Sequence, residues 1–168
     1  FLSLLEFKNQ LITVPKHTYL SVPMTLKLQG FNVKFREEKW NGSYRMGNTN
    51  VWDCAVGFEK DMYVETQIQC LSFHQKKRLA IGKGGAILTD DVDLAIKLKR
   101  LRHDGRTSSI PDSVEINDSP NDIILGYHMY MSPDEAAKGI LLLNQLSDQY
   151  TNGTWNDYPD ISQLECFK

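Results

Sequence analysis

The stretch from residue 11 to residue 37 constrains the fold most, because its apolar pattern changes from strand to helix and back to strand. The run LITVP (Leu11–Pro15) is short, apolar and β-prone, and a proline closes it. In SVPMTLKLQG (Ser21–Gly30), a proline suits a first helical turn and a glycine suits a helix end. FNVKFRE (Phe31–Glu37) then alternates apolar and polar residues. This order predicts a βαβ unit, and therefore an α/β fold class with a partly parallel sheet.

Later segments predict three more strands and two helices. Apolar β-prone runs lie in Val51–Phe58, Tyr63–Phe73 and Gly84–Asp91, and the first of them contains one acid. A helix is predicted from Asp90 to Gly105, because apolar residues recur at helical spacing between an acidic start and a glycine. A second helix is predicted to begin at Ser132, which is followed by a first-turn proline and a capping-box glutamate.

The remaining stretches lack a regular period. Lys39–Asn50, rich in glycine and asparagine, is predicted to be a loop, and the polar Arg106–Asp122 is predicted to be a mobile loop. The leucines of Leu141–Leu143 are predicted to lie in the core. We predict one core over residues 1–150 and a C-terminal tail over residues 151–168, since a chain of 168 residues suits a single domain.

Composition narrows the function classes. The formal net charge of −2 argues against nucleic-acid or membrane-surface binding driven by bulk charge, and no apolar run is long enough to span a bilayer. The three cysteines (Cys54, Cys70 and Cys166) are odd in number and widely spaced, which favours a reducing compartment and a cytoplasmic location.

Several familiar site types are missing from the sequence. The glycines of GKGG fit neither a Walker loop nor a dinucleotide fingerprint, because no Ser or Thr follows the lysine and the glycines precede a strand. A Gly-x-Ser-x-Gly elbow is absent, and no cysteine pair has metal-ligand spacing. The four histidines are scattered at His17, His74, His103 and His128, so no metal site is predicted.

What remains is a lysine near a serine between two predicted strands, together with an acid on an earlier strand. Lys77, Ser72 and Asp53 provide these groups. Pyridoxal 5′-phosphate (PLP) needs such a set: a lysine amine to carry it, a carboxylate for its ring nitrogen, an aromatic partner for its ring, and hydroxyl or amide groups for its phosphate.

The segment SFHQKKRLAIGKGG (Ser72–Gly85) resembles the Schiff-base segment of the DegT/StrS family of PLP-dependent sugar aminotransferases. That resemblance implies that Lys77 carries PLP and that Ser72 contacts its phosphate. Lys76 and Lys83 would be bystanders. Without the motif, Lys77 is an ordinary surface lysine in a basic turn, and Ser72 hydrogen-bonds its own backbone.

Other segments resemble the same family in the same order, over roughly residues 11–147. VPKHTYLSV places Tyr19 where the family stacks an aromatic ring on the cofactor, and VWDCAV places Asp53 where the family has its ring-nitrogen acid. GYHMYMSPDEAAKGILLLNQL places His128 where an asparagine reaches the neighbouring subunit's phosphate. The alternatives are core or rim packing for Tyr19, a loop-capping acid for Asp53 and a surface histidine for His128.

The chain also departs from the family pattern. Val56 replaces a Gln or His at the ring hydroxyl, Tyr130 replaces an Arg, and Lys83 replaces a Glu. The early phosphate-binding segment would precede Phe1, and a large stretch between the second and third predicted strands is missing. The small C-terminal domain is absent or reduced to the tail. The chain is therefore expected to be a truncated or fragmentary large-domain core of the fold-type I PLP transferases, with a mixed, mostly parallel sheet.

The resemblance implies an aminotransferase that moves an amino group from glutamate to a keto sugar attached to a nucleotide. Lys77 would be its catalytic residue, and the family's shared site implies a homodimer. A dehydrating relative is disfavoured, because that variant has histidine in place of the lysine. The alternative is a catalytically inactive relic that kept the fold and acts as a binding or scaffolding dimer.

Overall fold

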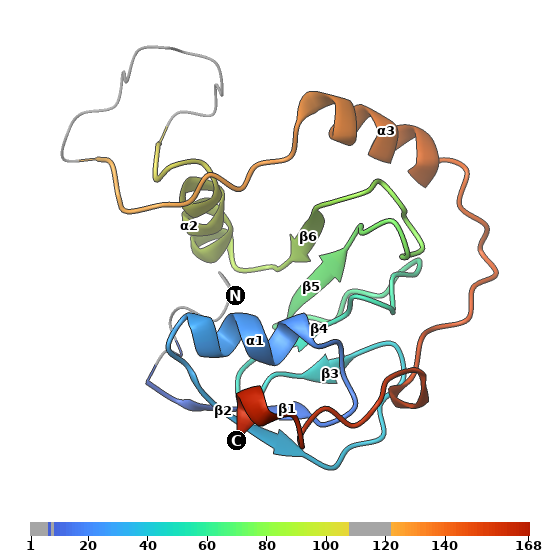
Figure 1. Ribbon diagram of the computed structural model, residues 1–168. Helices are drawn as coiled ribbons and strands as arrows, with labels where there is room; N and C mark the ends of the chain where they lie inside the picture. The colour runs from blue at the N-terminus through green and yellow to red at the C-terminus, as the bar shows by residue number, and fades with distance from the viewer. Residues whose placement is uncertain (1–6, 8, 108–121) are drawn as a thin grey trace.

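Two sheets organise the computed structural model, which describes residues 7, 9–107 and 122–168 (Figure 1). In the first sheet, β1 (Leu11–Pro15) pairs in parallel with β2 (Asn32–Arg36), and α1 (Ser21–Leu28) joins them. The predicted βαβ unit is therefore confirmed. Ile12 and Val14 of β1 are fully buried, so the strand lies within the core.

The second sheet is mixed. Its inner pair, β4 and β5, is parallel, and both outer pairs are antiparallel. Across the described residues the two sheets thus contain two parallel and two antiparallel pairings, which is more antiparallel pairing than the sequence indicates. The strand order of this sheet is β3 (Tyr44–Arg45), β4 (Val51–Asp53), β5 (Ile68–Ser72) and β6 (Gly85–Leu88).

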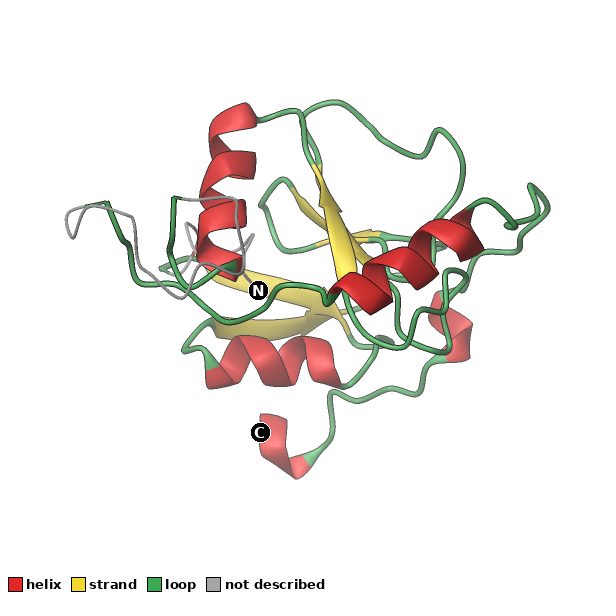
Figure 2. Cartoon of the chain, turned by 90° about the horizontal axis from the view of Figure 1, so that it is seen from above, coloured by secondary structure: helices red, strands yellow, loops and turns green. Residues whose placement is uncertain are grey.

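The two later helices begin and end close to the predicted positions. Helix α2 (Val92–Arg102) starts after Asp91, whose carboxylate accepts a hydrogen bond from the Leu94 amide. Helix α3 (Pro133–Leu143) has the predicted capping box between Ser132 and Glu135. Figure 2 shows the three α-helices arranged around the strands.

Two predictions about the core need correction. Leu141 and Leu143 are 65% and 48% exposed, because α3 packs on only one side and turns these leucines outward. The Lys39–Asn50 segment, predicted to be a loop, contains the short β3 and buries Trp40 and Tyr44. Most of the predicted mobile loop, residues 108–121, lies outside the described residues.

The C-terminal tail forms two 3-10 turns, η2 (Trp155–Asp157) and η3 (Glu165–Phe167). It returns past β3 and β1 and ends close to β2 (Figure 1). The Phe167 ring meets the Phe35 ring at 5.2 Å between centroids, and Ile161 is only 5% exposed. The division of the chain at residue 150 stays a prediction. No helix among the described residues is long and apolar enough to cross a bilayer.

Candidate active site

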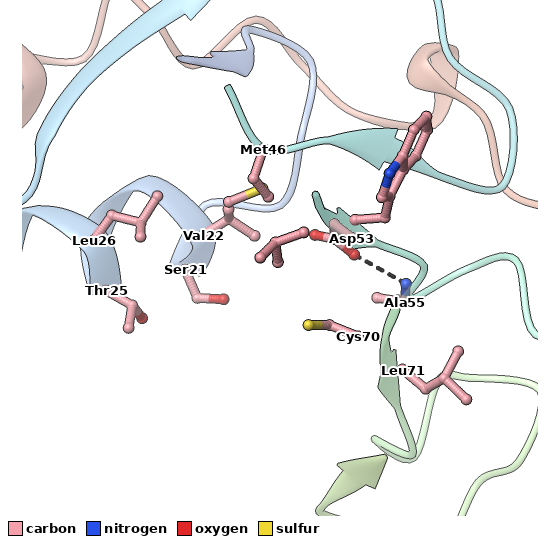
Figure 3. A pocket seen from close by; sticks show the side chains of 11 residues that line it. Ser21, Val22, Thr25, Leu26, Met46, Asp53, Ala55, Cys70 and Leu71 are labelled. Atoms are coloured by element: carbon pink, nitrogen blue, oxygen red, sulfur yellow. Dashed lines mark hydrogen bonds between the residues drawn. The ribbon is translucent and has the colours of Figure 1, made fainter. Parts of the chain in front are cut away.

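Asp53 lies at the C-terminal end of β4, where the chain leaves the sheet. One carboxylate oxygen accepts a hydrogen bond from the Tyr44 hydroxyl at 2.7 Å. The other accepts one from the Ala55 amide at 2.9 Å, which Figure 3 shows as a dashed line. The second bond is the loop cap that a strand-end acid commonly makes. The first holds the other oxygen from a neighbouring strand. The carboxylate is therefore fixed in place by two donors.

Tyr44 is the residue that the sequence interpretation missed. Its hydroxyl also bonds the Thr18 hydroxyl at 2.6 Å, and because it donates to Asp53 it must accept from Thr18. Burial, followed by the negative charge of Asp53, holds the pKa of Tyr44 well above its ordinary value, so the phenol stays a donor. Trp40, Tyr44 and Met46 are separated by four and two residues, so in a strand they would share one face. This was the available signal, but the surrounding Gly and Asn residues obscured it.

Lys77 lies in the turn between β5 and β6. The Arg78 guanidinium holds this turn by donating to the Phe58 carbonyl at 2.6 Å, and Lys138 of α3 donates to the Ile81 carbonyl at 2.7 Å. Partial burial lowers the pKa of Lys77, and the negative charge of Asp53 opposes that shift. The lysine amine and the Asp53 carboxylate therefore lie within electrostatic reach of each other.

Tyr19 lies just before α1, and its ring faces the lysine amine. The Lys77 Nζ is 6.0 Å from the centre of the Tyr19 ring, a weak cation–π geometry. The tyrosine is 58% exposed, so its ring is not used in core packing. The structure thus brings together Tyr19, Lys77 and Asp53 from three separate segments.

Ser72 ends β5, five residues before the lysine. It is half-buried, and its hydroxyl oxygen accepts a long hydrogen bond of 3.4 Å from the His74 amide. This is the backbone contact that a serine commonly makes at a strand end. Among the described residues its hydroxyl proton has no acceptor, so it could donate to a ligand oxygen.

His128 lies elsewhere. It is exposed, its ring nitrogen is 3.2 Å from the Asp104 carboxylate, and its ring packs edge-on against Tyr130. No contact in the described part of the chain joins it to Asp53 or Lys77. Its predicted contact is with a neighbouring subunit and stays a prediction.

The other departures from the family pattern also have places in the fold. The Val56 side chain packs against Gly153 of the tail, where an added Cβ would approach within 2.9 Å. Lys83 is exposed in the turn before β6. Among the described residues, no group of three or more His, Cys, Asp or Glu side chains could hold a metal ion.

A cavity of about 230 Å³ opens beside Asp53. It lies between the first turns of α1 and the ends of β4 and β5. Ser21 and Cys70 point toward it from the two sides (Figure 3). Its walls combine apolar side chains with these few polar groups, as small-molecule sites commonly do. The full lining consists of Ser21, Val22, Thr25, Leu26, Met46, Val51, Trp52, Asp53, Ala55, Cys70 and Leu71.

The side chains of Asp53, Tyr19, Lys77 and Ser72 suit an aromatic cofactor that has a cationic ring nitrogen, an aldehyde and a phosphate. The fixed Asp53 carboxylate matches the ring nitrogen, the Tyr19 ring offers a stacking face, and the Lys77 amine can add to the aldehyde. The free hydroxyl proton of Ser72 matches a phosphate oxygen.

Comparisons with known proteins identify the family and the fold. The model of the DegT/DnrJ/EryC1/StrS aminotransferase family matches residues 59–154, more than half of the 168-residue chain. The fold resembles a crystal structure described as a "Putative PLP-dependent aminotransferase" from Bacillus cereus ATCC 10987, with a TM-score of 0.64 and 18% identity. The match covers 89% of this chain and 48% of the other, so this chain spans about half the length of that structure. No curated protein matches the chain. Because the family model covers most of its length, this chain belongs to the DegT/DnrJ/EryC1/StrS aminotransferase family.

Proposed function

We propose that the chain is a PLP-dependent aminotransferase and that Lys77 is its catalytic residue. One observation carries this proposal: the Lys77 amine faces the Tyr19 ring at 6.0 Å and lies in the field of the Asp53 carboxylate. Family membership supports the reaction class. When bound, PLP supplies an electron sink for the transfer of an amino group.

Lys77 would act as both nucleophile and proton carrier. Burial lowers the pKa of its amine, so the neutral form is reached at a lower pH than for an exposed lysine. The neutral amine can attach the cofactor through its aldehyde. Once a donor amine has taken its place on the cofactor, the freed Lys77 amine would carry a proton between the donor's α-carbon and the cofactor.

Asp53 would hold the charged ring nitrogen. Its two hydrogen bonds, from the Tyr44 hydroxyl and the Ala55 amide, keep the carboxylate in one orientation. A fixed negative charge favours a protonated ring nitrogen. Tyr19 would cover one face of the ring, and Ser72 would donate to the phosphate.

We further propose that the amino donor is glutamate and that the acceptor is a keto sugar linked to a nucleotide. The chain belongs to an aminotransferase family, and its motifs resemble those of sugar aminotransferases. Both support this substrate class. A homodimer follows from the same reasoning, with His128 reaching the neighbouring subunit's phosphate. A cytoplasmic location suits a chain in which none of the three cysteines, all within the described residues, forms a disulfide.

Titration with PLP followed by glutamate tests the function. Purified protein should develop an absorbance band that differs from that of free PLP and saturates at one cofactor per chain. Glutamate should then replace this band by that of the aminated cofactor, releasing 2-oxoglutarate. A bound-cofactor band that glutamate leaves unchanged would support PLP as the cofactor but contradict glutamate as the amino donor. Absence of any such band would contradict the proposed enzyme function.

The packing of Val56 favours one alternative, a non-catalytic relic of the family. Its side chain is apolar, packs on Gly153 and offers no hydrogen bond to a ligand. Calorimetric titration with PLP and with a nucleotide sugar separates the two functions. Heat from neither ligand, together with a stable dimer in sedimentation, would support the relic.

A further inference from the structure

A second cavity, of about 170 Å³, lies on the face of β4 and β5 opposite to Asp53. Asp53 and Cys70 are register partners in these strands and line the first cavity. Trp52 and Gln69 are the partners one residue earlier, and Gln69 borders only the second cavity. Successive side chains of a strand point to opposite faces of the sheet. The second cavity is therefore a different place from the proposed PLP site.

Gln69 brings an unsatisfied hydrogen-bond acceptor to this second cavity. The residue is only 4% exposed, and its amide nitrogen donates to the Met62 carbonyl at 3.2 Å and to the Gln67 side-chain oxygen at 2.9 Å. A backbone carbonyl can only accept, so the Met62 bond fixes which end of the Gln69 amide is the nitrogen. The amide oxygen is buried and has no hydrogen-bond partner within the described residues. A donor from a ligand would remove the free-energy cost of this lone acceptor.

The other polar groups around this cavity are acceptors as well. The side-chain oxygen of Asn152 is a second buried atom without a partner in the described part of the chain. Glu59 lines the cavity from an exposed position, and its carboxylate forms no ion pair or hydrogen bond with another described residue. None of the described residues that line the cavity is Lys, Arg or His. The cavity therefore combines buried oxygens and a negative charge with no positive side chain.

Two further lining residues narrow the class of ligand. The Trp52 side chain adds an indole ring, whose face attracts cations. Burial raises the pKa of the Cys54 thiol to about 12, so this residue stays neutral and offers no thiolate to a soft metal ion. An anion would meet the Glu59 carboxylate without any positive partner. A cation that also donates hydrogen bonds suits the lining best.

We propose that this second cavity binds a small ammonium group, a primary amine in its protonated form. Its N–H groups donate to the side-chain oxygens of Gln69 and Asn152, and its positive charge is balanced by the Glu59 carboxylate. The ammonium group supplies both the donors and the charge that the lining lacks. This site goes beyond the proposed aminotransferase function, because it lies on the other face of the sheet and needs no PLP.

Methylammonium is the probe that tests the site, in the absence of PLP and at an ionic strength held constant with sodium chloride. Its binding to the folded chain should raise the unfolding midpoint in a saturable way, which gives a dissociation constant. Tetramethylammonium carries the same charge without an N–H group, and potassium carries it without any hydrogen-bond donor. Neither should raise the midpoint. An equal rise with either cation, or no rise with methylammonium, would overturn the proposal.

Two variants place the bound ammonium group in this cavity. Gln69→Met keeps the length of the side chain but removes the buried acceptor, so methylammonium should bind about tenfold more weakly or worse. Glu59→Gln removes an exposed charge and should weaken binding about two- to fivefold. Because Glu59 is exposed, this second variant keeps the test decisive if Gln69→Met does not fold.

Glu65→Gln is the matched control. Glu65 is also an exposed carboxylate between β4 and β5, but it does not line the cavity, so this variant should bind methylammonium normally. Unchanged affinity in Glu59→Gln or in folded Gln69→Met would contradict the site. An equal loss of affinity in Glu65→Gln would show that the charge of the loop, and not the cavity, attracts the cation, which would also overturn the proposal.

Discussion

The Tyr44 hydroxyl donates a hydrogen bond to the Asp53 carboxylate at 2.7 Å while accepting one from the Thr18 hydroxyl at 2.6 Å. Tyr44 and Thr18 are 3% and 2% exposed, so this relay is shielded from water. It connects the segment before α1, which also carries Tyr19, to the acid at the end of β4. The relay therefore fixes the position of the carboxylate relative to the aromatic ring and the lysine.

Tyr44→Phe tests this relay. The substitution keeps the ring but removes the donor to Asp53, leaving both the carboxylate and the Thr18 hydroxyl short of a partner. We expect the free energy of unfolding to fall by about 2 kcal/mol, as measured by urea denaturation. PLP affinity should fall as well, because the carboxylate is less firmly held. Tyr63→Phe is the control, since that phenol is 37% exposed. It donates to the Gln67 carbonyl at 3.2 Å and accepts from the Asp90 amide at 2.9 Å, where water can replace both partners, so this variant should lose less stability. A Tyr44→Phe protein as stable as the unmodified chain would contradict the relay.

Lys77 should react with amine reagents at lower pH than an exposed lysine. Only the neutral amine is nucleophilic, and burial lowers the pKa of Lys77. Quantitative labelling with an acylating reagent across a pH series, read by peptide mass spectrometry, gives its midpoint. Lys76 is the internal control, because it is the neighbouring residue and is exposed. In the Asp53→Asn background the Lys77 midpoint should move lower still, since the charge that raises its pKa is removed. A midpoint that does not respond to this substitution would place the amine outside the field of Asp53.

The anchoring of the C-terminal tail should depend on pH through Asp160, which pairs with Lys16. Hydrogen bonds from Ser162, followed by the nearby Lys16, lower the pKa of Asp160 to about 2 from an ordinary 3.8. A carboxylate with a lowered pKa contributes stability above its unfolded value of 3.8, and this contribution is lost as the pH falls toward 2. Asp160→Asn should therefore lower the free energy of unfolding by at most about 1 kcal/mol at neutral pH, because the pair is partly exposed. The difference should vanish near pH 2.

Glu165→Gln is the control for that experiment. It removes the same charge from the tail but only breaks an exposed pair with Lys168. Little or no loss of stability is expected at any pH. A loss as large as that of Asp160→Asn would show that tail charge, rather than the bond to Lys16, sets the effect.

Local patterns were sufficient to predict most of the regular elements, though not the short β3. The βαβ unit follows from the change of apolar period between residues 11 and 37, and the start of α3 follows from Ser132, a proline and Glu135 within one turn. These signals depend on near neighbours in the chain. The prediction that Leu141–Leu143 lie in the core is right for Leu142, which packs against the core, and wrong for Leu141 and Leu143. Hydrophobicity alone does not say which side of a helix has a partner.

The support of the site could not be predicted in the same way. The bond between Thr18 and Tyr44 joins residues 26 positions apart, and the Tyr44 segment has the composition of a loop. The bond between His17 and Tyr158 joins residues 141 positions apart, and the tail has no apolar period. Such contacts are set by the packing of the whole chain. The motif around Lys77 could be recognised because it is local, whereas the residues that hold Asp53 could not.

The most direct test of the central claim is to trap the cofactor on its lysine. Protein incubated with PLP is reduced with borohydride, digested, and analysed by peptide mass spectrometry. We predict one pyridoxyl group per chain, attached to Lys77, which is absent from Lys77→Ala and retained in Lys76→Ala. Attachment at Lys76 or Lys83, or labelling of Lys77→Ala to the same extent as the unmodified chain, would contradict the assignment.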